Sequence, residues 1–136
     1  MATFQRFEDI EAWQRAREIS RQVYRLTNEG GFARDFGLRD QIRRAAVSVM
    51  ANIAEGFGRG GNREFSQFPG HSRGSLAELK SHLYVALDAG LIDRAVFDEL
   101  AALISPTEAQ ISGLISYLAK SEYRGSRLHR TLNLKP

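Results

Sequence analysis

Four long segments of the chain carry apolar residues at every third or fourth position, which is the spacing of one face of an α-helix. Within residues 8–27, for example, Ala12, Ala16 and Ile19 share a face while Glu11 falls on another side. No segment shows the strict alternation of apolar and polar residues that marks a half-buried β-strand. The spacing therefore predicts an all-α protein.

The predicted helices cover about residues 8–27, 38–57, 62–88 and 93–122, and short connections join them. Successive long helices with short connections pack antiparallel, as in an up-down-up-down four-helix bundle. A chain of 136 residues has the size of one ordinary domain and is long enough to bury a core. We therefore expect a single antiparallel four-helix-bundle domain over residues 1–136.

Prolines fall inside two of the predicted helices. Because proline lacks an N–H and clashes with the preceding turn, it costs about 3 kcal/mol in a helix interior. The apolar stripe nevertheless keeps its phase across both Pro69 and Pro106. We expect kinks near these two prolines, with a capping box at Ser105 that restarts the second of these helices.

The second predicted helix is apolar on nearly every side. Between Ala45 and Ala54 it has no charged residue, and Val47, Met50 and Ala51 occupy the side that should face water. A helix that is apolar all round is buried on all sides, whereas each helix of a four-helix bundle normally keeps one solvated side. We therefore predict an oligomer interface at Val47, Met50, Ala51 and Ala54. A central helix in an irregular monomer is the alternative.

The segment after this helix matches G-x-G-x-x-G at Gly56, Gly58 and Gly61. A dinucleotide-binding loop needs these glycines after a strand, but here they follow a helix. We interpret Gly56 and Gly58 as helix terminators with positive φ. A weaker functional interpretation is also open, in which free amides at the start of the next helix, with Arg59 and Arg63 nearby, hold a phosphate of a larger ligand.

Residues suited to catalysis are few. The chain has no cysteine, and its serines lack a G-x-S-x-G-like context. His71, Glu78 and His82 fall on one side of the third predicted helix, and such residues can bind zinc or a di-iron pair. A metal site in a bundle needs matching ligands on other helices, where no inward histidine is expected. We expect no catalytic residue, metal or cofactor, and therefore a protein that is not an enzyme.

The expected location is the cytoplasm. Residues 1–9 lack the apolar core of a signal peptide, and no apolar run approaches the roughly 20 residues that span a bilayer. Without cysteine, no disulfide requires an oxidising compartment. A membrane partner is not expected.

The basic residues are mostly arginine, with 16 Arg and three Lys. Arginine binds phosphate with two parallel hydrogen bonds, which suits nucleic-acid contact. Several of these arginines fall in a basic C-terminal segment, residues 124–136, that we expect to be a flexible tail. The candidate nucleic-acid-binding residues are Arg39, Arg43, Arg44, Arg59, Arg63, Arg124, Arg127 and Arg130. Salt bridges to acidic residues of the first and fourth helices are an equally open explanation.

Several separate motifs stand in order and at short spacing: Phe7–Ala16, Gln41–Val49, Ala51–Arg59, Glu64–Phe65 and Gly74–Leu79. Together they resemble the bacterial four helix bundle protein family, also known as the proteins encoded in intervening sequences of 23S ribosomal RNA genes. The resemblance implies a homo-oligomer of four-helix bundles, usually a closed pentamer, with a role that is mostly unassigned. A related branch, the accessory proteins of diversity-generating retroelements, binds nucleic acid and partners a reverse transcriptase.

The chain departs from the family pattern at two places. Met50 stands where the family often has proline, which favours an unkinked second helix. Phe68-Pro-Gly-His71 stands where the family usually has a continuous apolar helix, which favours a bend.

Two functions follow as hypotheses. In the first, a self-assembling bundle, expected to be a pentamer, presents arginines to RNA or DNA through electrostatic contacts. In the second, the oligomer is a scaffold or adaptor for a protein partner, and the arginines serve only solubility and salt bridges between subunits.

Overall fold

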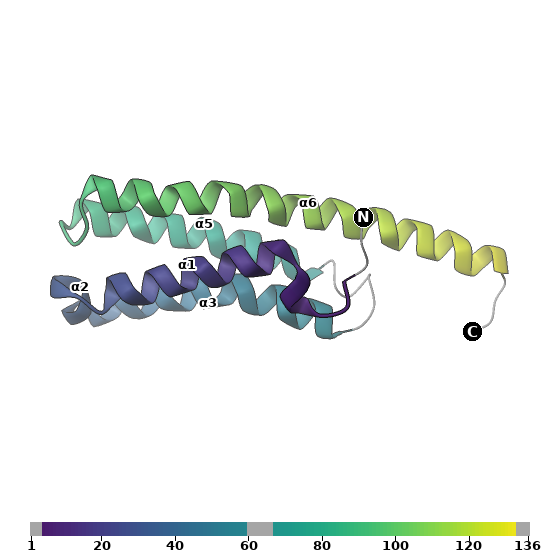
Figure 1. Ribbon diagram of the computed structural model, residues 1–136, viewed down its shortest axis with the longest axis horizontal. Coiled ribbons are helices and arrows are strands. Elements are labelled where there is room, and N and C mark those ends of the chain that lie inside the picture. Colours follow the sequence, from purple (N-terminus) through teal and green to yellow (C-terminus); the bar gives the residue numbers. More distant parts are fainter. Residues whose placement is uncertain (1–3, 60–66, 133–136) are drawn as a thin grey trace.

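The computed structural model describes residues 4–59 and 67–132, with side chains described up to residue 120. A 3-10 turn, η1 (Phe7–Asp9), precedes the helices. The helices are α1 (Glu11–Thr27), α2 (Gly30–Arg34), α3 (Phe36–Gly58), α5 (Gln67–Asp88) and α6 (Arg94–Leu132). Figure 1 shows the four long ones side by side and alternating in direction. The described residues include no strand, so the predicted all-α bundle is confirmed.

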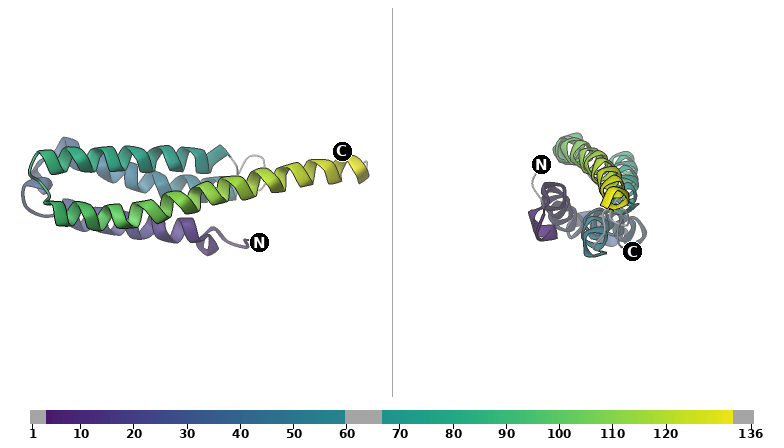
Figure 2. Two further views of the ribbon diagram at one scale, coloured as in Figure 1. Left: turned by 90° about the horizontal axis from the view of Figure 1, so that it is seen from above. Right: turned by 90° about the vertical axis from the view of Figure 1, so that its right-hand side faces the viewer.

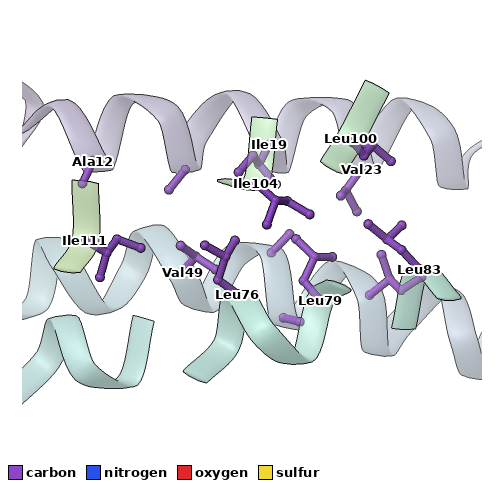
Figure 3. Close-up of a cluster of buried hydrophobic side chains, with 14 of the residues drawn as sticks. Ala12, Ile19, Val23, Val49, Leu76, Leu79, Leu83, Leu100, Ile104 and Ile111 are labelled. Carbon is purple, nitrogen blue, oxygen red and sulfur yellow. The ribbon is translucent and has the colours of Figure 1, made fainter. Parts of the chain in front are cut away.

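The bundle has one core, to which all four long helices contribute. α1 packs against α3 and α6, and α5 packs against the same two helices, so that α1 and α5 lie diagonally opposite each other. Figure 3 shows the interdigitated side chains, which include Ile19 from α1, Val49 from α3, Leu79 from α5 and Ile104 from α6. All four are at most 2% exposed. The apolar stripes therefore meet as their spacing predicted.

Small polar residues let α3 and α5 approach each other closely. The Ser72 hydroxyl is fully buried and donates a 2.7 Å hydrogen bond to the Val49 carbonyl oxygen across the interface. About one turn further along α5, the Ser75 hydroxyl is hydrogen-bonded at 2.8 Å to the hydroxyl of Ser48, which adjoins Val49 on α3. These pairs satisfy hydroxyl groups that burial would otherwise leave unpaired.

The turn between α5 and α6 depends on one glycine. Gly90 has φ +76°, a conformation that is strained for residues with a Cβ. Its N–H donates to the Leu87 carbonyl, and the next N–H, from Leu91, donates to the Ala86 carbonyl. This is a Schellman ending, which satisfies the last carbonyls of α5. Asp93 then accepts a hydrogen bond from the Val96 N–H at 2.9 Å, as an N-cap of α6.

Two local expectations are wrong. The connection between the first two long helices contains the short helix α2, because Phe32 is buried and anchors the chain there. Gly56 lies inside α3 and Gly58 is its last residue, and neither has the expected positive φ, because among the described glycines only Gly30 and Gly90 do. α3 still ends at Gly58, followed by residues 60–66, which include the rest of the glycine motif and lie outside the described residues.

The two prolines interrupt neither helix as described. α5 runs from Gln67 through Pro69 to Asp88; the preceding residues are not described, so the expected kink there stays a prediction. α6 runs unbroken through Pro106, and the expected restart at Ser105 is wrong. The missing N–H affects one hydrogen bond, to the carbonyl of the exposed Ala102, where water can compensate. Figure 2 shows α6 as one continuous helix.

α6 also extends further than expected. It ends at Leu132, so residues 124–132 are helical, while residues 133–136 lie outside the described part. The expected flexibility of the segment 124–136 stays a prediction. Extending an existing helix needs no new nucleus, and this segment has no proline and only one glycine before residue 133. The extension projects beyond the other helices (Figures 1 and 2).

Candidate functional site

The outer face of α3 exposes apolar side chains. Val47 is 39% exposed, Ala51 is exposed, and Met50 and Ala54 are half-buried. Their neighbours Ala46, Val49 and Ile53 face the core. The single bundle thus leaves one side of this helix uncovered, and the four residues predicted for an interface share that side of one helix.

Arg39 is held by its own surroundings. It donates to the Ala33 carbonyl oxygen at 3.1 Å, forms an ion pair with Asp40 at 3.2 Å, and stacks on the Phe36 ring at 4.7 Å. These contacts join α2 to the first turn of α3. Arg39 therefore has a structural role in addition to its charge.

Arg43 connects α3 to the end of α1. Its Nε donates to the Thr27 hydroxyl at 2.7 Å and its Nη2 to the Asn28 side-chain oxygen at 2.9 Å. The guanidinium also lies 4.5 Å from the centre of the Tyr24 ring. All these partners are uncharged, so the side chain keeps its full positive charge while it bridges two helices.

Arg44 and Arg59 differ in their partners. Arg44 is exposed and has no ion pair or hydrogen bond among the described side chains. Arg59 pairs with Glu55 at 3.1 Å and lies 5.5 Å from the Phe68 ring centre. None of the four described candidate arginines, residues 39, 43, 44 and 59, forms the expected salt bridges to α1 or α6; their ion pairs are local.

The candidate arginines do not form one patch. Residues 39–44 lie at the start of α3, and Arg59 follows its end, about 22 Å from Arg44 at 1.5 Å per residue. Arg124, Arg127 and Arg130 lie in the α6 extension, at the same end of the bundle as Arg59 (Figure 1), with side chains outside the description. Arg63 lies outside the described residues. The structure thus separates the predicted set into two groups at opposite ends.

A further arginine row on α1 was missed by the sequence reasoning. Arg17, Arg21 and Arg25 line a shallow groove of about 490 Å³ together with Tyr24 and Met50. Their spacing of four residues was visible in the sequence and places them on one side of a helix. Nothing in the sequence, however, indicated that this side would adjoin the exposed face of α3.

The expected line of histidine and glutamate has ordinary surface contacts. His82 is 3.2 Å from the Glu78 carboxylate, one turn away, and the His71 ring lies 6.1 Å from that of Phe68. Within the described part of the chain, no three His, Cys, Asp or Glu residues gather in a way that could hold a metal ion. No described helix is long and apolar enough to cross a membrane.

The fold and these surfaces define an all-α, up-down-up-down four-helix-bundle protein with an uncovered apolar helix face beside arginine-rich surfaces. The family model of the 23S rRNA-intervening sequence protein matches residues 8–113. The chain belongs to this family. A search of the curated proteins finds no match.

Proposed function

We propose that the chain is a non-enzymatic protein that assembles with copies of itself through the outer face of α3. The observation that carries the proposal is the exposure of Val47 and Ala51, beside the half-buried Met50 and Ala54, in a stretch without any charged residue. Burying apolar surface stabilises association by roughly 25 cal/mol per Å². The small side chains Ala51 and Ala54 also let a neighbouring helix approach closely. A closed pentamer is the form that the family resemblance implies.

The test is the mass of the purified protein in solution, measured by light scattering after size-exclusion chromatography. The wild type should be an oligomer, and Val47→Glu should be a monomer with unchanged helicity by circular dichroism. Ala102→Glu introduces the same charge at an exposed position of α6 and should leave the assembly intact. A monomeric wild type at micromolar concentration would sink the proposal.

A second candidate function is electrostatic binding of RNA or DNA. The specific observation that favours it is Arg44, which is exposed and has no acidic partner among the described side chains. Arg43 adds a charge next to it that is not neutralised by a carboxylate. A weak site becomes strong when it is repeated around a symmetric oligomer, because the second contact is intramolecular.

Salt titration of binding to an RNA hairpin and a DNA duplex tests this second function. Affinity should fall steeply with salt, since phosphate contacts release counterions. Arg44→Glu should weaken binding and lower the log–log salt slope, whereas Arg44→Lys should retain most of both. Arg39 and Arg43 are poorer probes because their replacement also removes contacts between helices. If neither nucleic acid binds at low salt, the remaining alternative is a scaffold for a protein partner.

The proposal includes a cytoplasmic location and no catalytic role. A stoichiometric metal ion in the purified protein, measured by elemental analysis, would contradict the absence of a catalytic role. Glu78 and His82 would then be the first candidate ligands.

A further inference from the structure

The large hydrophobic side chains that the described surface exposes lie mainly on two faces. Tyr24 and Val47 lie on the side formed by α1 and α3, at 42% and 39% exposure. Tyr84 and Val85 lie on α5, at 47% and 50% exposure. Phe36, the fifth, begins α3. Two separate apolar surfaces therefore need an explanation.

The first surface carries positive charge. We call it the basic patch and define it as Arg17, Arg21, Tyr24, Arg25, Val47 and Met50. Arg21 pairs with Glu18 at 3.2 Å, but Arg17 and Arg25 have no carboxylate partner among the described side chains. A neutral partner on this surface would leave two arginines without a counter-charge.

The second surface carries negative charge. We call it the acidic patch and define it as Glu78, Val85 and Asp88. Tyr84 adjoins this patch on the side of α5 that also carries Arg73 and Lys80. Glu78 and Asp88 are exposed. Glu78 lies 3.2 Å from the His82 ring one turn away, and neither carboxylate forms an ion pair with lysine or arginine among the described side chains. The half-buried Lys80 lies about 140° around the helix from Val85, at 100° per residue.

The two patches face different directions. The basic patch is centred on α1, and α1 does not contact α5, which carries the acidic patch. The end-on view of Figure 2 shows the helices arranged around the bundle axis rather than in a flat layer. One copy therefore cannot bring its own patches together, but two copies can.

We propose that the basic patch of one copy binds the acidic patch of the next. This inference rests on the proposed self-assembly and names the surfaces that meet. Arg17 and Arg25 are about 12 Å apart along α1, and Glu78 and Asp88 are about 15 Å apart along α5, at 1.5 Å per residue. The carboxylates of Glu78 and Asp88 can thus face the two arginines of the neighbouring copy. Val85 then packs against Val47 and Met50 between these charge pairs.

Such a contact joins two unlike surfaces. An open assembly then keeps one free basic patch at one end and one free acidic patch at the other, so that addition continues until a ring closes. A two-fold contact between two α3 faces would instead stop at a dimer. The pairing of opposite charges also disfavours contacts between two basic or two acidic patches.

Mixing two variants tests the inference. Val47→Glu damages the basic patch and Val85→Glu damages the acidic patch, and both replace exposed residues, so the fold should persist. Each variant alone should be monomeric. An equimolar mixture should form a 1:1 dimer and nothing larger, because only one intact pair of patches exists between the two variants. Native mass spectrometry resolves these species, and circular dichroism confirms that each variant is folded.

The outcomes separate this inference from the proposed function. A monomeric wild type overturns both. An oligomeric wild type whose Val85→Glu variant assembles normally overturns the pairing of patches and leaves self-assembly intact. The same holds if both variants are monomeric but their mixture gives no dimer. The charge pairing is tested in the dimer of the Val47→Glu and Val85→Glu variants. Arg25→Glu, added to the Val85→Glu variant, should raise the dissociation constant of this dimer by tenfold or more. Glu78→Arg, added to the Val47→Glu variant, should recover part of the lost affinity.

Discussion

Arg43 shows that a residue in a basic cluster can be needed for the fold. The sequence suggested nucleic-acid contact for Arg39, Arg43 and Arg44 together, because they are close along one helix. The structure distinguishes them by their partners: Arg43 binds Thr27 and Asn28, whereas Arg44 binds no described side chain. These partners lie about 16 residues earlier in the chain, at a separation that helical spacing alone does not relate to Arg43.

Replacing Arg43 should therefore reduce stability. Arg43→Ala removes two hydrogen bonds from a charged donor and the contact with Tyr24, and should lower the free energy of unfolding by about 1–3 kcal/mol. Urea unfolding followed by circular dichroism measures this. Arg44→Ala is the matched control and should change the free energy by less than about 0.5 kcal/mol. Equal effects of the two substitutions would contradict the assignment.

At the scale of elements, α3 and α5 pack through serine hydroxyls. The apolar stripes of both helices were readable from the sequence, since they depend on local spacing alone. The pairing of Ser72 with the Val49 carbonyl was not, because it depends on how two helices are shifted along each other. The same limit explains the short helix α2, which a single buried side chain, Phe32, stabilises through contacts beyond its own segment.

Ser72 is a sensitive position in this interface. Ser72→Ala should cost about 1 kcal/mol through the lost hydrogen bond, and Ser72→Leu should cost about 1–3 kcal/mol because the closely packed helices must separate. Thermal unfolding of both variants gives the order of the effects. The exposed Ser81 on the same helix provides the control, and Ser81→Leu should leave the unfolding temperature nearly unchanged. A stabilising Ser72→Leu would show that the interface has unused space.

α6 tolerates a proline in its interior at an energetic cost. The in-phase apolar stripe on either side of Pro106 correctly indicated that the chain does not reverse there. The expected restart was wrong because the capping box pattern also fits a continuous helix. In this helix the Thr107 hydroxyl donates to the Leu103 carbonyl one turn earlier, at 2.8 Å, as it can in a helix interior.

Pro106→Ala should accordingly stabilise the protein. Alanine restores the missing N–H and removes the clash of the ring, so the free energy of unfolding should rise by about 1–3 kcal/mol. Chemical denaturation measures the change, and Ala109→Gly, which weakens the same helix at an exposed site, should shift it in the opposite direction by about 1 kcal/mol. A loss of stability in Pro106→Ala would mean that the proline shapes the helix in a way the fold requires.

At the scale of the whole molecule, the sequence correctly indicated the bundle and its family. It also indicated which side of α3 would lack a partner inside the bundle, because the apolar residues outnumber what one core can cover. It could not show that the arginines fall into separate groups. That separation follows from the length of α3 and from the direction of α6, which are properties of the assembled bundle.

Self-assembly should make thermal stability depend on protein concentration. Only folded subunits can associate, so association stabilises the folded state by mass action. The unfolding temperature of the wild type should therefore rise as the protein concentration increases a hundredfold. The unfolding temperature of Val47→Glu should stay constant over the same range. Differential scanning calorimetry compares the two directly. A constant temperature for both proteins would be inconsistent with assembly in this range.

The length of α6 has a consequence for any ring built by rotation alone. Rotation about a single axis keeps every subunit pointing the same way, so in a ring whose bundles stand along that axis all the α6 extensions would emerge from one rim and none from the other. Such a ring has a front and a back. A partner approaching along the axis would meet the projecting α6 helices on one side and the short helix α2 with the α5–α6 turn on the other, so the two sides of the assembly would offer different binding surfaces.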